Sequence, residues 1–341
     1  WDDKKAVARD PKTLEKYRTM LVDQIQYFKV TQYFFFKQWS ELKHYANQKG
    51  IKIIGDMPIY VAADSVEVWT KPELFQLDKE RNPLFVAGVP ADQFSATGQL
   101  WGNPLYDWEE HKKQGYAWWI HRIEESFKIY DVLRIDHFKG FSDYWQVDGK
   151  ADIAKYGSWQ PGPGYDLFKA VKEQLGDLPI IAEDLGNIDD KARKLLADCN
   201  YPGMKILQFG FEDVSGKSLD SPHYCIPHSI VYTGTHDNDV TNGWYNGLTE
   251  QQQQYINDYT HRSEDESICQ AMICQLFATV SNTAIATMQD VLDLPASSRM
   301  NVPSTIGGNW QWRMQQSDLT QDKKDFLAKM TTLYQRANQE K

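Results

Sequence analysis

Four short apolar runs in this chain end on carboxylates. They are IKIIGD, ending at Asp56; VLRID, ending at Asp136; PIIAED, with Glu183 and Asp184; and SIVYTGTHD, ending at Asp237. An ionised side chain is costly to bury, so packing gives no reason for a carboxylate at the carboxyl end of a buried strand. The repeated pattern therefore predicts strands that deliver acidic side chains to one shared pocket.

Asp136, Glu183 and Asp237 are candidates for glycoside chemistry. Cleavage of a glycosidic bond uses two carboxyl groups, one as nucleophile or base and the other as general acid. Successive members of this trio stand about 50 residues apart, which is roughly one strand–helix–strand unit. We therefore expect the side chains to converge from neighbouring or next-neighbouring strands.

The residues beside these acids differ, and the differences suggest separate roles. Arg134 lies two positions before Asp136, on the same face of a strand, and a nearby guanidinium favours the ionised form that a nucleophile requires. The apolar residues before Glu183 are expected to raise its pKa toward that of a general acid. His236 and Asp237 stand in TGTHDND, whose short polar side chains suit hydrogen bonding to sugar hydroxyls.

Each of these features also has a purely structural interpretation. An aspartate at a strand end often caps the next helix, and Arg134 with Asp136 could form a structural ion pair. His236 could be a hydrogen-bonded structural histidine, and the aromatic run Tyr33 to Phe36 is expected to pack a helix against a barrel. The occurrence of acids on successive strands favours catalysis over these alternatives.

The predicted elements alternate between strand and helix, which indicates a parallel α/β sheet. Functional-looking residues follow every strand, as in a (β/α)8 barrel of the TIM type. The first strand is not followed by a GxGxxG motif, so the sequence gives no support for nucleotide binding. About six of eight strands are recognisable, so we expect an incomplete barrel domain over residues 1–341 whose first two strands lie before Trp1. The predicted strands are 51–55, 132–135, 179–182, 205–210, 229–233 and a last one ending at Asp290.

Helical periodicity is clear in several segments between these strands. A long stretch over 57–106, by contrast, is rich in Pro and Gly and poor in periodicity, and we expect a functional loop or inserted subdomain there. The predicted helices are 11–49, 107–128, 165–175, 189–199, 249–259, 265–280 and 318–339.

Composition limits the possible partners and location. The chain has 341 residues and a net charge of −10, with no basic stripe to attract nucleic acid or an anionic membrane. No apolar run approaches the roughly 18 residues needed to span a bilayer. The four cysteines form no CxxC or disulfide framework, so we expect reduced thiols and a cytoplasmic location. Its 12 Trp, 18 Tyr and 15 Phe suit stacking on sugar faces as well as a core.

Several long motifs resemble those of the 4-alpha-glucanotransferases, also called amylomaltases or disproportionating enzymes. RIDHFKGF (134–141), AEDLG (182–186) and THDND (235–239) carry the resemblance most specifically. It extends over nearly the whole chain through GDMPIYVAADS (55–65), GVPADQFSATGQLWGNPLYDW (88–108), QDVLDL and RMNVPST.

The resemblance implies a retaining α-amylase-type enzyme. Asp136 would be the nucleophile, Glu183 the acid/base and Asp237 the residue that holds sugar hydroxyls, with Asp56 ordering Arg134. Donors would be maltooligosaccharides or other α-glucans, with glucose as an acceptor. No metal or organic cofactor is expected, because two carboxyl groups suffice. The substrate-binding residues implied are Asp56, Tyr60, Asp92, Phe94, Gln99, Trp101, Asn103, Arg134, His137 and His236.

The segment with Phe94 and Trp101 offers a reason for transfer over hydrolysis. A glucosyl-enzyme is divided between water and a second sugar, so an aromatic cover that excludes water and binds an acceptor favours transfer. Two alternatives remain at this point: an α-amylase-like hydrolase, and a glucan-binding fragment without catalytic activity.

Overall fold

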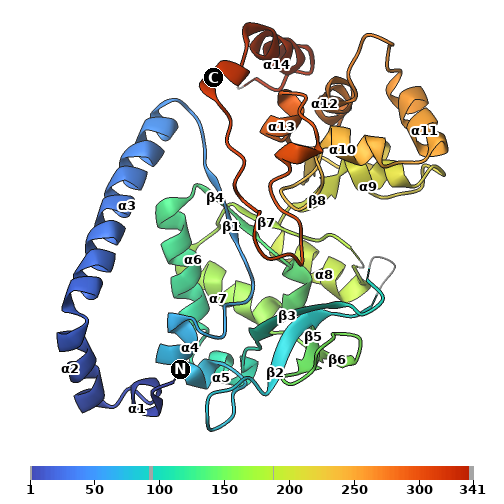
Figure 1. Ribbon diagram of the computed structural model, residues 1–341. Coiled ribbons are helices and arrows are strands. Elements are labelled where there is room, and N and C mark those ends of the chain that lie inside the picture. The colour runs from blue at the N-terminus through green and yellow to red at the C-terminus, as the bar shows by residue number, and fades with distance from the viewer. Residues whose placement is uncertain (1, 92–94, 187, 338–341) are drawn as a thin grey trace. The chain divides into compact units, whose positions relative to one another are not determined.

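The computed structural model describes residues 2–91, 95–186 and 188–337. The chain forms two compact units, Trp1–Tyr201 and Pro202–Lys341, and each is described by itself (Figure 1). None of the helices in the described ranges has the length and apolar character to cross a bilayer.

The core of the first unit is a three-stranded parallel sheet in the order β1-β4-β7. The strands are β1 (Ile54–Met57), β4 (Val132–Ile135) and β7 (Ile180–Ala182). Leu133 and Ile135 of the central strand are fully buried, which accounts for the near-continuous apolar sequence of β4. In this register Asp56 of β1 is paired with Arg134 of β4, so the sheet itself brings two of the predicted site residues together.

The helices of the first unit follow the predicted pattern with two interruptions. The predicted helix 11–49 breaks at Leu21, and the predicted helix 107–128 breaks where Gly115 and Tyr116 adopt φ of 62° and 58°. Elsewhere the local signals hold: Asp189 caps α8 by accepting from the Ala192 N–H, and Gly176 follows α7. The helices are α1 (Lys4–Val7), α2 (Pro11–Met20), α3 (Val22–Gln48), α4 (Val66–Thr70), α5 (Trp108–Lys113), α6 (Ala117–Ile129), α7 (Tyr165–Leu175) and α8 (Asp190–Cys199), with 3-10 turns η1 (Pro72–Leu74) and η2 (Phe138–Phe141).

A second sheet in this unit was missed by the sequence analysis. It is antiparallel, has the strand order β3-β2-β5-β6, and takes two of its strands from the predicted loop 57–106. Its short strands carry Gly and Pro, which hides the period of two; at Gly88 a Cβ would lie 2.5 Å from the Gln99 carbonyl oxygen. The strands are β2 (Phe85–Val89), β3 (Gln99–Pro104), β5 (Asp143–Asp148) and β6 (Gly157–Pro161).

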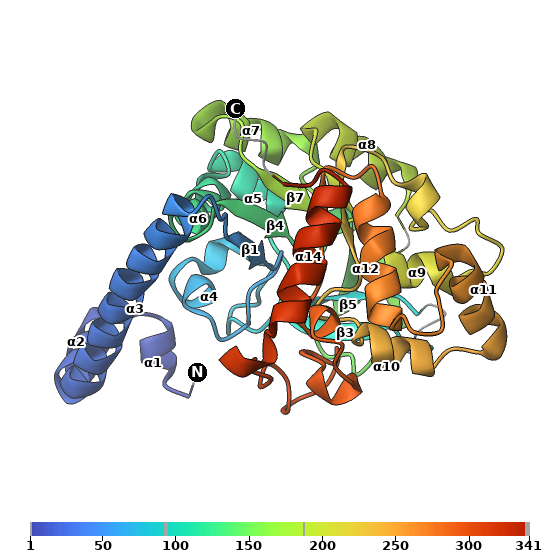
Figure 2. The same cartoon turned by 90° about the horizontal axis from the view of Figure 1, so that it is seen from above.

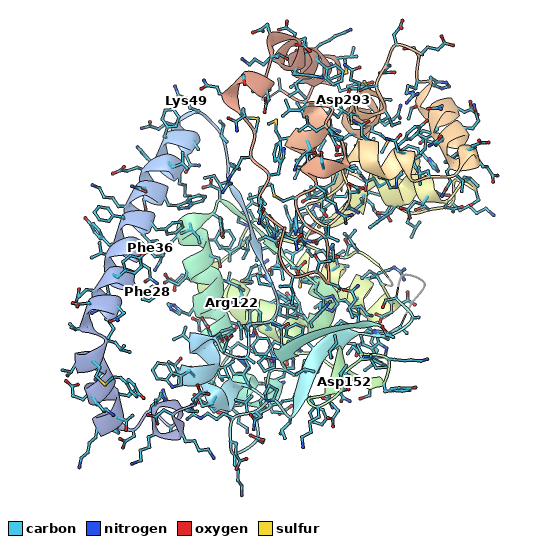
Figure 3. The ribbon with its side chains drawn as sticks, viewed as in Figure 1. Phe28, Phe36, Lys49, Arg122, Asp152 and Asp293 are labelled. Carbon is cyan, nitrogen blue, oxygen red and sulfur yellow. The ribbon has the colours of Figure 1, made fainter. Side chains whose placement is uncertain are left out.

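The expectation that Tyr33 to Phe36 pack against a barrel is wrong for the described residues. α3 runs along the flank of the unit, away from the parallel sheet, and none of its residues is buried (Figures 1 and 2). Polar contacts hold it instead: Trp39 Nε1 donates to the Ile129 carbonyl at 2.8 Å, and Lys43 Nζ donates to that of Tyr130 at 2.8 Å. Figure 3 labels two of its exposed aromatic residues, Phe28 and Phe36.

The second unit also contains a three-stranded parallel sheet, in the order β10-β9-β8. Apolar side chains of α9, α11 and α12 pack against it, with Leu207, Val231 and Met272 fully buried. The strands are β8 (Gly203–Ile206), β9 (Ser229–Tyr232) and β10 (Thr283–Ile285). The helices are α9 (Leu207–Glu212), α10 (Thr241–Asn246), α11 (Glu250–Thr260), α12 (Ile268–Ala278), α13 (Met288–Val291) and α14 (Gln321–Leu333), with 3-10 turns η3 (Pro222–Tyr224), η4 (Ala296–Ser298) and η5 (Gln316–Asp318).

The six predicted parallel strands are all present in the described residues, but two end earlier than expected. Residues predicted as the end of the strand 205–210 form α9, and the last strand stops at Ile285 rather than Asp290. Asp290 lies in α13, where Thr287 caps the helix by accepting from its N–H at 3.2 Å. Short capped helices directly after strands were not separable from strand by apolar content alone.

Candidate active site

An ion pair between neighbouring strands forms the base of the site in the first unit. Arg134 on β4 donates from one Nη1 to both carboxylate oxygens of Asp56 on β1, each at 2.7 Å, and to Asp136 Oδ1 at 3.1 Å. Burial lowers the pKa of Arg134, but the carboxylates of Asp56 and Asp136 more than offset this and leave the pKa raised. The buried guanidinium therefore stays charged and fixes both carboxylates.

Asp136 leaves β4 at the carboxyl edge of the sheet. Its N–H continues the ladder by donating to the Met57 carbonyl at 3.0 Å. His137 then turns the chain with φ 52° and ψ 51°, a left-handed conformation that costs roughly 1 to 2 kcal/mol for a residue with a Cβ. This turn leaves the Asp136 carboxylate partly exposed and directs the His137 N–H toward the next strand end.

Glu183 directly follows β7, where its N–H donates to the Ile135 carbonyl at 3.0 Å. Its carboxyl oxygens accept from the His137 and Leu185 N–H groups, both at 2.8 Å. Burial, and after it the charge of Asp136, raise the pKa of Glu183 to about 7, although Arg134 and the two N–H donors oppose the rise. A carboxyl group with this pKa is protonated in part at neutral pH, as a general acid requires.

Aromatic side chains of the antiparallel sheet and the β1 end cover the neighbourhood of these acids. The Trp101 ring of β3 lies edge-on to His137, with centroids 4.7 Å apart, and 6.2 Å from the Tyr60 ring. Gln99 accepts from Trp101 Nε1 at 3.3 Å, and Asn103 Nδ2 donates to the Val61 carbonyl at 2.9 Å. The covering strand is thereby tied to the loop after β1.

The predicted substrate residues are thus placed unequally. Arg134 and His137 contact Asp136 and Glu183, respectively, and Asp56 binds Arg134. Trp101 lies against His137 with Tyr60 beside it, while Gln99 and Asn103 brace the covering strand. Burial lowers the pKa of His137 to about 4, with a smaller effect from Lys139, so its ring is neutral near pH 7. Asp92 and Phe94 lie outside the described residues, and their predicted roles stay predictions.

His236 and Asp237 belong to the second unit, in the segment after β9. His236 Nε2 lies 3.3 Å from Asp237 Oδ2, and the His236 ring lies 5.1 Å from that of Trp310. Asp237 also accepts two hydrogen bonds that the sequence analysis did not predict, from Asn301 to its side chain and from Arg299 to its main chain. The motif RMNVPST contains both donors, but nothing in the sequence pairs them with Asp237. The convergence of Asp237 with Asp136 and Glu183 stays a prediction.

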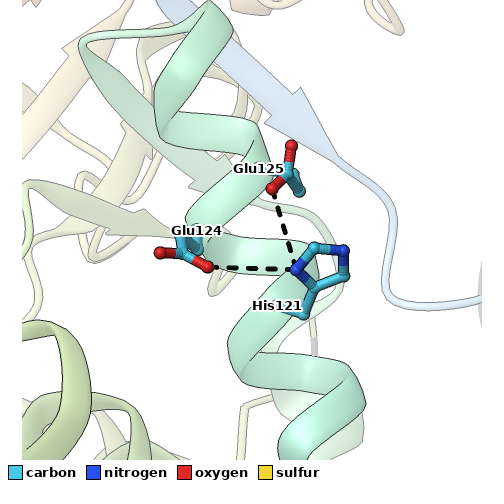
Figure 4. Close-up of side chains that lie close together, drawn as sticks. All are labelled: His121, Glu124 and Glu125. Atoms are coloured by element: carbon cyan, nitrogen blue, oxygen red, sulfur yellow. Dashed lines mark ion pairs between the residues drawn. The ribbon is translucent and has the colours of Figure 1, made fainter.

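A group with metal-ligand chemistry lies elsewhere on the first unit. Among the described residues, His121, Glu124 and Glu125 of α6 bring possible ligand atoms within 4.8 Å of one another (Figure 4). All are exposed, and Lys128 also pairs with Glu125. Ordinary ion pairing on a solvated helix face accounts for this cluster.

The geometry of the first unit provides an aspartate bound to Arg134 beside a carboxyl group with a raised pKa. Different environments push the proton affinities of paired carboxyl groups apart and so separate a nucleophile from a general acid. This arrangement can cleave a glycosidic bond through a covalent intermediate.

Comparisons with known proteins agree on one family. Residues 1–320 match the family model described as 4-alpha-glucanotransferase. The chain is 52% identical over 340 residues to the 4-alpha-glucanotransferase of Streptococcus pneumoniae, and 44% identical over 332 residues to that of Clostridium butyricum. These matches cover 99% and 96% of this chain, and 67% and 68% of the relatives.

The solved structures give the same result for the fold. The amylomaltase from Streptococcus agalactiae in complex with acarbose superposes with a TM-score of 0.97 at 58% identity, covering 99% of this chain and 68% of that one. The predicted α/β class of the barrel type is thereby confirmed. The number of strands in the complete barrel, and the single domain over 1–341, stay predictions.

Proposed function

The chain belongs to the 4-alpha-glucanotransferase family, and on this premise we propose that Asp136 and Glu183 perform its transfer reaction by a retaining mechanism. It is a transferase of the glycoside-hydrolase type that acts on α-glucans. Neither a simple hydrolase nor a silent binding fragment is favoured by such relatives.

In the first step the Asp136 carboxylate attacks the anomeric carbon of the donor glucan. The bond from this carbon to the leaving O4 breaks, and the Glu183 carboxyl transfers its proton to that oxygen. The product is a covalent glucosyl ester of Asp136. Arg134 supports this step because its guanidinium donates to the Asp136 carboxylate and is itself held by Asp56.

In the second step the ionised Glu183 takes a proton from the O4 hydroxyl of an acceptor sugar. That oxygen attacks the anomeric carbon and releases Asp136, so the enzyme returns to its first state. Asp237 would hold hydroxyl groups of the donor sugar while its ring carries positive charge. Glucose as an acceptor and a cytoplasmic location are parts of this proposal.

The raised pKa of Glu183 beside the Arg134-bound Asp136 is the observation that carries the proposal. Both environments arise from the β1-β4-β7 sheet and the turn at His137, so they belong to one rigid element of the first unit. Catalytic groups held by strands keep the alignment that a displacement in two steps requires.

Incubation with maltotriose tests the proposal. Transfer between two molecules yields maltopentaose and glucose, whereas hydrolysis yields maltose and glucose. We expect maltopentaose as an early product, followed by longer oligomers. If maltose and glucose form in equal amounts without longer chains, the transferase assignment fails for this protein.

Trp101→Ala is expected to shift the reaction toward water. The ring covers His137, next to the proposed nucleophile, and its loss would admit water while weakening acceptor stacking. We expect the ratio of hydrolysis to transfer on maltotriose to rise about 3- to 10-fold, as measured by the reducing ends formed per maltopentaose. Tyr156→Ala is the matched control, because Tyr156 is 73% exposed beside β6 of the same sheet. An equal change in both variants would refute the role of Trp101.

A further inference from the structure

A buried carboxylate in the second unit has no part in the chemistry proposed above. Asp290 of α13 is 2% exposed. Its Oδ2 accepts from Thr233 Oγ1 at 2.6 Å, and its Oδ1 accepts from the Thr241 N–H at 2.8 Å. Thr233 directly follows β9 and Thr241 begins α10, so one carboxylate ties together both ends of the segment that carries His236 and Asp237.

The segment between these ends is held internally as well. Asn238 Oδ1 accepts from the Thr235 N–H and from Thr235 Oγ1, at 2.8 and 2.9 Å. Gln208 Nε2, which is buried after β8, donates to the Asp239 carbonyl at 2.9 Å. The main chain of the segment between Thr233 and Thr241 is therefore fixed on both sides of Asp237.

A second segment, residues 299–310, then contacts Asp237 itself. Arg299 Nη2 donates to the Asp237 carbonyl and Asn301 Nδ2 donates to Asp237 Oδ1, both at 2.7 Å. Arg299 Nε also donates to the Asn301 carbonyl at 2.9 Å, which joins the two donors. The Trp310 N–H closes the base of this segment by donating to the Met300 carbonyl at 2.7 Å.

We propose that Asn301 and Asp290 are positioning residues for Asp237. Asn301 fixes the rotation of the carboxylate by occupying Oδ1, which leaves Oδ2, on the His236 side, to accept from a sugar hydroxyl. Asp290 fixes the place of the segment from which that carboxylate projects. The inference rests on the proposed role of Asp237 in stabilising the transition state.

An aligned hydrogen bond of this kind acts mainly in the transition state, because it strengthens as charge develops on the sugar. A loss of alignment should therefore lower kcat more than it changes KM. We expect Asn301→Ala to lower kcat about 10- to 100-fold, with KM for maltotriose changed less than about 3-fold. Asn309→Ala is the matched control, because Asn309 lies in the same segment and accepts from the Val302 N–H instead.

A double-mutant cycle with Asp237→Ala distinguishes positioning from general loosening. If Asn301 acts through Asp237, adding Asn301→Ala to Asp237→Ala should lower kcat by less than about 2-fold further. The inference is overturned if the second loss is as large as the first, or if Asn309→Ala matches Asn301→Ala. If Asp237→Ala alone leaves kcat unchanged, the proposed role of Asp237 fails, and that outcome is separate from the others.

Asp290 is tested by comparing two substitutions in the same cycle. Asp290→Asn keeps the acceptor for the Thr241 N–H and the shape of the side chain, and it should keep kcat within a few-fold of wild type. Asp290→Ala removes both links and should lower kcat as Asn301→Ala does. If the alanine variant does not fold, Asp290→Asn carries the test. The role of Asp290 is overturned if Asp290→Asn lowers kcat and lowers it by the same factor in the Asp237→Ala background.

Discussion

Asp136→Asn should abolish glucan transfer, lowering kcat by at least about 1,000-fold on maltotriose. The amide cannot form the ester with the anomeric carbon. The loss should persist with α-maltosyl fluoride as donor, because a better leaving group does not restore the missing nucleophile. Product formation from both donors, followed by chromatography, measures the effect.

The fold should survive this change, which makes the result interpretable. The Asp136 side chain is 41% exposed, and Arg134 keeps its two 2.7 Å contacts with Asp56. Asp152→Asn is the control of equal charge change, on an exposed turn between β5 and β6 (Figure 3). Substantial transfer by Asp136→Asn in a folded protein would show that another residue is the nucleophile.

Glu183→Gln should produce a similarly large loss on maltotriose but a much smaller loss in the rate of the first fluoride release from α-maltosyl fluoride. The amide cannot protonate the leaving O4, whereas fluoride departs without a proton. In wild type, kcat/KM on maltotriose should fall as pH rises through about 7, because Glu183 loses the proton it must donate. If kcat/KM fell equally with rising pH for the α-maltosyl fluoride donor and for maltotriose, Glu183 would not be the general acid.

The raised pKa of Glu183 also makes the free energy of unfolding depend on pH. Below the ordinary pKa of about 4.5 the side chain is protonated in both the folded and unfolded states, so it makes no difference. As pH rises, the unfolded state ionises first, and wild type loses up to about 3 kcal/mol relative to Glu183→Gln by pH 8. Urea unfolding at pH 5 and pH 8 measures this difference; Glu264→Gln, an exposed glutamate, should show no such change.

Part of the site could be predicted from the sequence because its cause is local. Asp136 follows Arg134 by two positions on a strand, so the period of two places both on one face whatever surrounds them. The caps of α7 and α8 were equally readable, since Gly176 and Asp189 act on their own helices. The parallel strands were recognisable for a similar reason: each is a short apolar run that ends on a polar residue.

Other features depended on contacts that no local pattern carries. Burial contributes most to the raised pKa of Glu183, and both the charge of Asp136, which raises it, and the His137 N–H, which lowers it, reach Glu183 from a different strand. The sequence predicted the direction of this shift from apolar neighbours, but it did not predict the two N–H groups that oppose it. Aromatic content also misled at α3, because helical periodicity says that a helix forms and not what lies against it.

The sequence by itself determined which acids stand at strand ends, the order of the parallel strands, and the family to which its motifs belong. The tertiary structure alone decided how the acids are held. Asn301 lies 64 residues from Asp237, and Asp290 lies 57 residues from Thr233. Hydrogen bonds across such separations depend on how whole strands and loops pack, and an Asn or Asp in a loop looks the same in sequence whether it aligns a carboxylate or faces water.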